Sequence, residues 1–181
     1  MNFWKGKNIR LRGVEPSDAE AFFAWNLDTD MARNLEFIWP PVSMAHIRDW
    51  AEKQSLKELE HDSFVWMIEN NEGAAVGSIR THNCIPRYGT FSYGVFVSLE
   101  HQRNNHAFEA VSIILRYYFH ELRYQKATVT VNAYNAESIA LHEKLGFRKE
   151  GTIRRMFCTA GEYHDVHWFG MTKEEWETEL R

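Results

Sequence analysis

The segment from Gln102 to Ala107 has residue types and a spacing that could bind an anion. An apolar run, Val95–Val97, lies just before it and is typical of the end of a buried strand. From Ala107 onward, apolar residues recur every three or four positions, which is typical of one face of a helix. The polar segment therefore leads into a helix N-terminus, where unpaired backbone N–H groups carry partial positive charge. Such a terminus is suited to a pyrophosphate.

A second group of reactive side chains lies between residues 131 and 151. Asn135 is predicted to cap a helix that ends at Gly146. At about 100° per residue, Ser138 and His142 share one face of this helix with two leucines. Polar groups on an inward face need hydrogen-bond partners, which could be the protein backbone or a bound reactant. Both alternatives stay open at this point.

Composition narrows the classes of function. The chain has 181 residues, 44% of them hydrophobic and 14% aromatic, which fits one globular domain. A net charge of −4 argues against a nucleic-acid partner, and no stretch is long and apolar enough for a signal peptide or a membrane span. Cys84 and Cys158 lie far apart without metal-ligand spacing, so we expect a reduced, cytoplasmic protein without a metal.

The elements that must position these residues follow from periodicity and turn signals. Strands are predicted over 8–12, 64–69, 74–81, 90–97, 128–131, 147–158 and 163–171. Helices are predicted over 16–27, 43–56, 107–122, 135–146 and 173–180. Segment 26–41 ends in Trp39-Pro40-Pro41 and is expected to interrupt the helical pattern. A helix connects strands 90–97 and 128–131, so these should pair in parallel. The predicted class is α/β (α+β), a single domain with a mixed central sheet and helices on both faces.

Both motifs resemble the GCN5-related N-acetyltransferases (GNAT). The family's loop motif is Gln/Arg-x-x-Gly-x-Gly/Ala, and Gln102 and Ala107 occupy its two ends. Asn105 stands where the family usually has glycine, a mild departure because Asn tolerates positive φ.

The second motif is Asn-x-x-Ser followed by a helix that ends in Gly-Phe. Asn135, Ser138, Gly146 and Phe147 occupy these positions. Two motifs in the correct order are more specific than either alone, and the segment looks most like the branch of ribosomal-protein-alanine and spermidine acetyltransferases.

The resemblance implies a GNAT domain over residues 8–171, a short C-terminal helix over 172–181, and acetyl-CoA as acetyl donor. Cofactor binding is then expected at Val95, Phe96, Val97, Gln102, Arg103, Asn104, Asn105, His106, Ala107, Phe108 and Asn135. The strand would bond the pantetheine arm through its main chain. The loop would bind the pyrophosphate through backbone N–H groups, with help from the charge of Arg103.

The proton donor to the leaving thiolate has two candidates. Many relatives carry a tyrosine at the position of His142, and imidazole titrates near neutral pH. Ser138 is the alternative, because the equivalent serine has this role in relatives that acetylate ribosomal proteins. Glu36 is the candidate for orienting a cationic amine substrate.

Several alternatives remain open. A phosphate-binding NTPase would need a Gly-rich loop with Lys-Ser or Lys-Thr, which residues 102–107 lack. A non-catalytic GNAT-fold protein that binds CoA as a sensor is the main rival to an enzyme. The expected partner is an amine-bearing acceptor, which could be a polyamine, a protein N-terminus or a small amine. Neither a nucleic acid nor a membrane is expected as a partner, and a homo-oligomer stays open.

Overall fold

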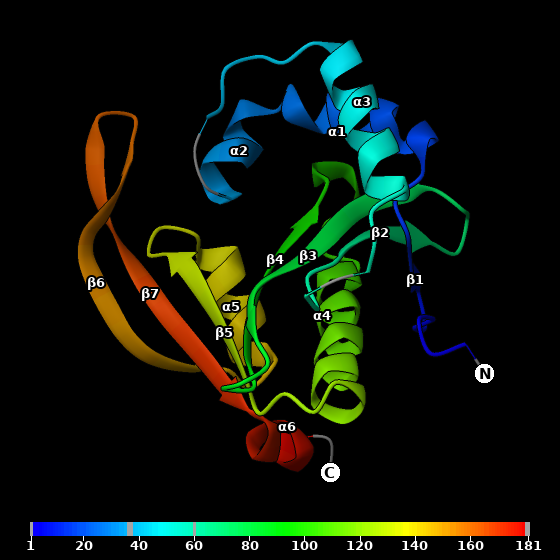
Figure 1. Ribbon diagram of the computed structural model, residues 1–181. Helices are drawn as coiled ribbons and strands as arrows, with labels where there is room; N and C mark the ends of the chain where they lie inside the picture. Colours follow the sequence, from blue (N-terminus) through cyan, green and yellow to red (C-terminus); the bar gives the residue numbers. More distant parts are fainter. Residues whose placement is uncertain (1, 36–37, 60, 180–181) are drawn as a thin grey trace. The chain divides into compact units, whose positions relative to one another are not determined.

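The structure is a computed structural model that describes residues 2–35, 38–59 and 61–179 (Figure 1). In chain order the described elements are β1 (Ile9–Arg12), α1 (Ala19–Asn26), α2 (Thr29–Leu35), α3 (Met44–Ser55), β2 (Val65–Asn70), β3 (Ala75–Ile85), β4 (Thr90–Val97), α4 (His106–Arg116), β5 (Lys126–Asn132), α5 (Ala136–Lys144), β6 (Arg148–Thr159), β7 (Glu162–Thr172) and α6 (Lys173–Glu179). The strands form a mixed sheet in the order β1-β2-β3-β4-β5-β7-β6. The predicted mixed α/β class is confirmed.

The chain forms two compact units that share β3, β4 and α4. The first unit covers the chain up to Arg80 together with Val95–Ile113. The second unit covers Thr81–Gly94 and the chain from Ile114 onward.

In the first unit, α1 and α3 pack against each other over a small apolar core. Ala19 of α1 and Ala51 of α3 are fully buried in this core. Ser43 caps α3 as predicted, because its Oγ accepts a hydrogen bond from the His46 N–H at 3.1 Å. Met67 of β2 lies in the same buried core, and β2 pairs antiparallel with β1 and β3.

An ion-pair cluster ties the start of α1 to two strands of the same unit. Arg12 of β1 contacts Asp18 at 2.7 Å and Glu69 of β2 at 2.6 Å. Burial alone would raise the pKa of Asp18, but the hydrogen bonds from Arg12 and from the Glu15 N–H outweigh it and lower that pKa. Arg10 and Arg12 lower the pKa of Glu69 in the same way.

In the second unit, β5 is the central strand. It pairs in parallel with β4, as predicted, from Thr90↔Lys126 to Ser92↔Thr128. On its other side it pairs antiparallel with β7, which forms a long two-stranded ribbon with β6 (Figure 1, orange). Phe91 of β4 stacks on Tyr118 with ring centroids 4.1 Å apart, within the aromatic core of this unit.

Two predictions of secondary structure were wrong in extent. Segment 26–41 contains α2, whose N-terminus is capped by Asp28 through hydrogen bonds from the N–H groups of Asp30 and Met31. Met31 is its single buried residue, so the helix has no apolar stripe to recognise. Strand β3 also continues to Ile85 beyond the predicted end at Thr81.

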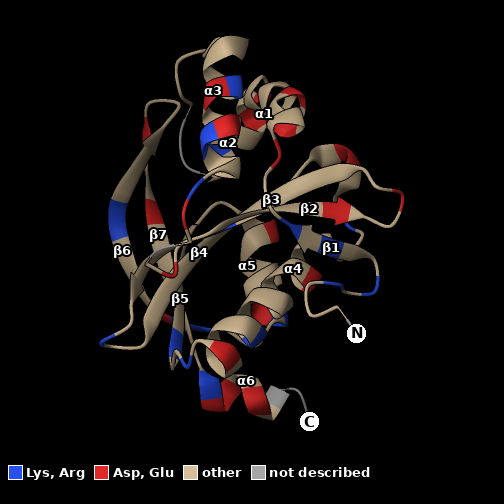
Figure 2. Ribbon diagram, turned by 45° about the vertical axis from the view of Figure 1, so that its right-hand side comes forward, with Lys and Arg blue, Asp and Glu red and all other residues tan. Residues whose placement is uncertain are grey.

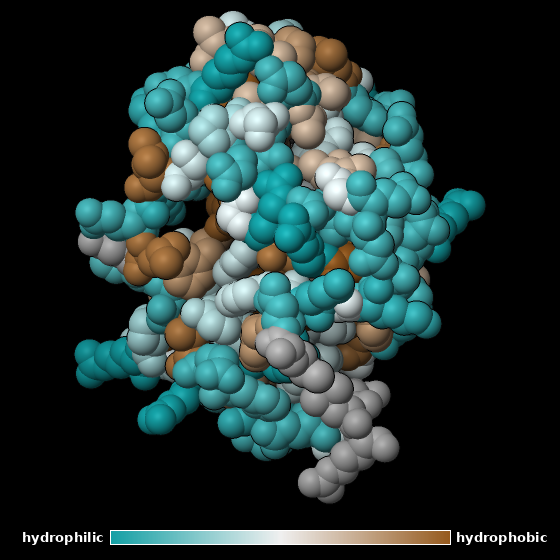
Figure 3. All heavy atoms as spheres, turned by 90° about the vertical axis from the view of Figure 1, so that its right-hand side faces the viewer, coloured by the Kyte–Doolittle hydropathy of each residue, from teal (hydrophilic) through white to brown (hydrophobic). Residues whose placement is uncertain are grey.

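The surface carries both signs of charge. Figure 2 shows acidic residues gathered on α6 and charges of both signs on α3. The face in Figure 3 is mainly hydrophilic, with small hydrophobic groups between polar side chains. No helix in the described ranges is long and apolar enough to cross a membrane. Among the same residues, no group of His, Cys, Asp and Glu could hold a metal ion.

Candidate functional site

The end of β4 offers main-chain groups along one edge. The β4–β5 pairs in the described sheet stop at Ser92, whereas β4 continues to Val97. The Ser98 N–H donates to Val76 of β3 at 2.9 Å, and the carbonyl of Phe96 lies so close to Gly77 of β3 that a Cβ there would collide with it. Because backbone groups alternate along a strand, the N–H and C=O of Val97 point away from β3.

The Val97 carbonyl already has a hydrogen-bond partner. Gln102 Nε2 donates to it at 3.3 Å and also contacts the sulfur of Met31 on α2 at 3.5 Å. The side chain of Gln102 thus connects the cofactor loop predicted from the sequence with β4 and with α2. These three residues all belong to the first unit.

The loop before α4 bends through two residues in the left-handed region. Asn105 has φ 61°, as expected for a residue at the family's glycine position, and Arg103 has φ 63°, which the sequence did not predict. The Asn105 carbonyl accepts the Glu109 N–H at 3.0 Å, so helical hydrogen bonding starts at Asn105. The next N–H groups, those of His106 and Ala107, therefore lie in the first turn of α4, where backbone donors lack helical partners.

Polar side chains hold this loop together. Ser98 Oγ lies 3.0 Å from His101 Nδ1, and Asn104 Nδ2 donates to the His101 carbonyl at 3.4 Å. His106 is buried, and burial is the main reason why its pKa is lowered. The exposed residues of the loop are Arg103, Asn104 and Asn105.

The second unit carries the residues of the second motif. Asn135 caps α5 as predicted, because its Oδ1 accepts the Ser138 N–H at 3.0 Å. His142 Nδ1 lies 2.7 Å from the Ser138 carbonyl and 3.4 Å from Ser138 Oγ. Since a carbonyl only accepts, we assign the proton of His142 to Nδ1.

His142 is enclosed by aromatic rings. Its ring lies 5.8 Å from Tyr93, 5.4 Å from Phe147 and 5.9 Å from Phe169, and the side chain is 2% exposed. Burial lowers its pKa to about 4, although the Ser138 carbonyl opposes this shift. The imidazole is therefore neutral at pH 7, and its Nε2 has no hydrogen-bond partner among the described residues.

The structure brings the predicted residues together in two sets. Val95–Val97 and Gln102–Phe108 are contiguous in the first unit, whereas Asn135, Ser138 and His142 share α5 and its cap in the second. Glu36 lies outside the described residues.

The sequence prediction missed Tyr93, whose ring stacks on His142 and whose buried hydroxyl has no partner among the described residues. Its position on β4, two residues before Val95, places it on the same face of the strand as Val95 and is the signal that could have identified it.

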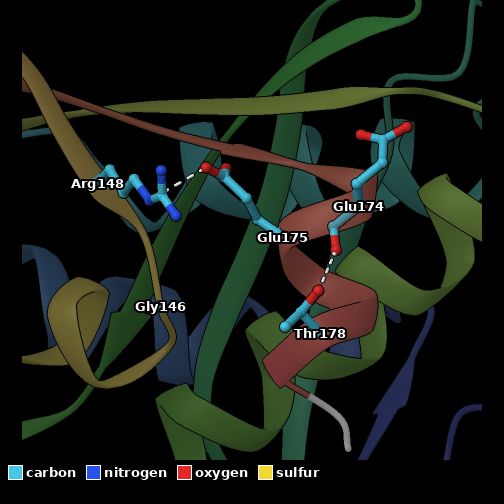
Figure 4. Close-up of a pocket in the computed structure, with 5 residues that line it drawn as sticks. All are labelled: Gly146, Arg148, Glu174, Glu175 and Thr178. Atoms are coloured by element: carbon cyan, nitrogen blue, oxygen red, sulfur yellow. Dashed lines mark hydrogen bonds and ion pairs between the residues drawn. The ribbon is translucent and has the colours of Figure 1, made fainter.

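A pocket of about 220 Å³ lies in the second unit. It is lined by Gly146, Arg148, Glu174, Glu175 and Thr178 (Figure 4). An ion pair of 3.1 Å between Arg148 and Glu175 spans it. None of the predicted site residues lines this pocket.

Comparisons with known proteins support the family resemblance of the two motifs. A family model described as an acetyltransferase (GNAT) domain matches residues 8–148. The chain is 39% identical over 177 residues to the SPbeta prophage-derived uncharacterized N-acetyltransferase YokL of Bacillus subtilis (strain 168), covering 98% of this chain and 97% of that protein.

Solved structures share the fold. A GNAT-family acetyltransferase from Bacillus anthracis has a TM-score of 0.79 at 22% identity, over 94% of this chain and 98% of the other. The spermidine N-acetyltransferase of Vibrio cholerae, solved with CoA and spermine, also has a TM-score of 0.79, at 20% identity, over 93% of this chain and 98% of the other. The family match, the relative of high identity and the shared fold agree: the chain belongs to the GNAT family of acetyltransferases.

Proposed function

We propose that the chain transfers the acetyl group of acetyl-CoA to a primary amine, by direct attack of the amine in a ternary complex. This proposal rests on the geometry of the first unit. The main-chain groups of Val97 point away from β3, and the first turn of α4 follows within the same continuous segment. One segment thus offers partners for both an amide-containing arm and a pyrophosphate.

Residues of β4 and its loop would bind the donor. Val95, Phe96 and Val97 would bond the pantetheine arm through the main chain, and the Val97 N–H would stabilise negative charge on the thioester oxygen. The Val97 carbonyl accepts a hydrogen bond from the Gln102 side chain, and on cofactor binding it would accept one from an amide N–H of the pantetheine arm instead.

The loop would bind the pyrophosphate. Backbone N–H groups between Gln102 and Phe108 would be the donors, and Arg103 would add positive charge. Asn104, Asn105, His106 and Ala107 belong to this loop through their main chain, and Asn135 would bond the pantetheine region.

Between the two candidates for the proton donor, the local geometry favours Ser138. His142 is neutral at pH 7, its Nδ1 proton is engaged by the Ser138 carbonyl, and its ring is enclosed. Ser138 is partly exposed as a residue, whereas His142 is 2% exposed. We therefore propose that Ser138 protonates the leaving thiolate and that His142 positions Ser138 through its carbonyl. Glu36 stays a proposed contact for the amine.

The acceptor is proposed as a class. Spermine is present in the structure of the Vibrio cholerae enzyme, and a polyamine, a protein N-terminus or a small amine would each supply a primary amine. We propose a cytoplasmic location, where acetyl-CoA is present. We also propose that the reaction involves no nucleic acid, membrane or metal. Further copies of the chain remain a candidate partner.

One observation favours a second candidate, a CoA-binding sensor without catalysis. His142 replaces the family's usual proton-donating tyrosine, and it is buried. Transfer of an acetyl group to any amine would exclude this alternative.

Two measurements test the proposal. Acetyl-CoA should raise the melting temperature, because it binds the folded state, and thiol release should accompany turnover with a primary amine.

Arg103→Gln should weaken CoA binding several-fold. Arg87→Gln, at an exposed turn between β3 and β4, is the matched control and should leave binding unchanged. The absence of a melting shift at millimolar acetyl-CoA would overturn the cofactor assignment.

A further inference from the structure

An aromatic pair lies next to the proposed thioester position. Trp25 of α1 packs on Phe96 of β4, with ring centroids 5.0 Å apart and an interplanar angle of 53°. Both residues are partly exposed. Phe96 directly precedes Val97, whose N–H is proposed to contact the thioester oxygen, and all three residues belong to the first unit.

Neighbouring aromatic rings hold the ring of Trp25 in place. Phe22 contacts Trp25 edge-on at 5.3 Å and Trp50 of α3 at 4.7 Å. These rings pack on the buried core between α1 and α3. A ring fixed in this way loses little side-chain entropy when a ligand packs on it, which favours binding.

Three acidic groups around α1 and α2 are engaged within the protein. Asp18 pairs with Arg12 at 2.7 Å, and Glu20 pairs with Arg48 of α3 at 3.0 Å. Asp28 accepts the N–H groups that begin α2. A polyamine with several positive charges would compete with these contacts, whereas an apolar group would meet the aromatic pair.

We infer that the preferred acceptor is a primary amine that carries an apolar or aromatic group, which packs on Trp25 and Phe96. This inference rests on the proposed function, and it assigns specificity for the acceptor to these two side chains. The amine nitrogen attacks the thioester carbonyl carbon and forms the amide bond, the C–S bond breaks, the nitrogen gives up one proton and the thiolate takes up one. Trp25 takes no part in these bond changes and orients the acceptor.

The test compares acceptors that differ in their apolar group. We expect kcat/KM for phenethylamine to exceed that for ethylamine by about 10- to 100-fold, since specificity of this size is common in apolar sites. Spermidine should be the poorer acceptor relative to phenethylamine. Trp25→Leu should bring the phenethylamine-to-ethylamine ratio toward one, with the KM for acetyl-CoA unchanged, and Trp25→Phe should retain most of the ratio.

Trp50→Leu is the matched control, because it removes a ring of the same size that contacts Phe22 rather than Phe96. It should lower the ratio far less than Trp25→Leu does, because Trp50 reaches Trp25 only through Phe22. Phe96→Leu supplies a second variant in case Trp25→Leu does not fold, as judged by its melting temperature. An equal loss of the ratio in the Trp50 and Trp25 variants would indicate a general packing effect and overturn the inference.

Binding separates this inference from the proposed function. Calorimetric titration of phenethylamine in the presence of CoA should show binding that Trp25→Leu weakens much more than Trp50→Leu does. If acetyl-CoA neither binds nor turns over with any amine, the proposed function fails. If acetyl-CoA binds and turns over but ethylamine or spermidine equals phenethylamine, the function stands and the aromatic specificity is wrong.

Discussion

At the scale of single residues, His142 and Ser138 illustrate how environment decides between two candidate proton donors. A histidine on the surface would titrate near neutral pH, but aromatic rings around His142 lower its pKa to about 4. The sequence places both side chains on one face of the helix but does not tell how many rings surround the imidazole, because those rings come from β4, β7 and the end of α5.

Ser138→Ala should lower kcat by about 100-fold, the lower end for loss of an acid–base group. The KM for acetyl-CoA should change little, because the lost interaction belongs to the transition state. Steady-state kinetics with saturating amine would measure both constants.

His142→Ala serves as the comparison. It removes a buried ring and a hydrogen bond to the Ser138 carbonyl, so we expect a loss of about 2–4 kcal/mol in the free energy of unfolding. Its kcat should fall less than that of Ser138→Ala when both are measured on folded protein. The opposite ranking would assign the acid role to His142.

Asn105 is the second residue with a clear expectation. Its φ of 61° suits glycine, so Asn105→Gly should fold normally and bind CoA at least as tightly as the natural chain. Asn105→Ala should destabilise the loop by roughly 1 kcal/mol, because an alanine disfavours the left-handed region.

Isothermal titration of CoA would test this expectation, with Asn83→Gly as control at another exposed asparagine of positive φ, outside the loop. A large loss of affinity in Asn105→Gly alone would identify the asparagine side chain as a ligand contact.

At the scale of elements, the close approach of β3 and β4 depends on Gly77. A Cβ at this position would collide with the backbone carbonyl of Phe96, which cannot move independently of the strand. Gly77→Ala should therefore lower the free energy of unfolding by about 1–3 kcal/mol and weaken CoA binding, since Phe96 and Val97 shift together.

Gly151→Ala on β6 is the matched control, because a Cβ there meets nothing within 4 Å. Urea denaturation should show a change within about 0.5 kcal/mol for this variant. Equal stability of the two variants would mean that β3 and β4 tolerate a larger separation.

Long elements with strong periodicity could be predicted from the sequence, whereas short ones could not. The Ser43 and Asn135 caps and the parallel β4–β5 pairing are confirmed. Helix α2 was missed because one buried methionine gives no periodic signal. The contact of Trp25 with Phe96 joins distant parts of the chain, and no local pattern encodes it. The roles assigned to the site residues remain predictions.

At the scale of the whole molecule, two sets of groups couple stability to pH in different ranges. Asp18 and Glu69 have lowered pKa values in the folded state. Their ionised forms therefore stabilise the fold at any pH above their ordinary pKa values of 3.8 and 4.5, and this stabilisation is lost as the pH falls below those values. His142 affects the stability of the protein at higher pH. Its unfolded value is 6.5 and its folded value about 4, so the unfolded chain binds more protons between these limits.

His142 should therefore make the protein lose stability as pH falls from about 6.5 to 4, by up to about 3 kcal/mol for a shift of this size. His142→Phe keeps an aromatic ring in the same enclosure but cannot bind a proton. Its free energy of unfolding should depend much less on pH across this interval. Some dependence should remain, because burial also lowers the pKa of His106.

Urea denaturation at pH 7, 5.5 and 4.5 would measure the dependence on pH in both proteins. His46→Phe, at an exposed position on α3, is the control and should keep the slope of the natural chain. Below about pH 4 the natural chain and His142→Phe should both lose stability steeply, because Asp18 and Glu69 take up protons and release Arg12. Identical slopes between pH 6.5 and 4 for the natural chain and His142→Phe would mean that the imidazole is protonated inside its enclosure. That result would also restore His142 as an acid at the site.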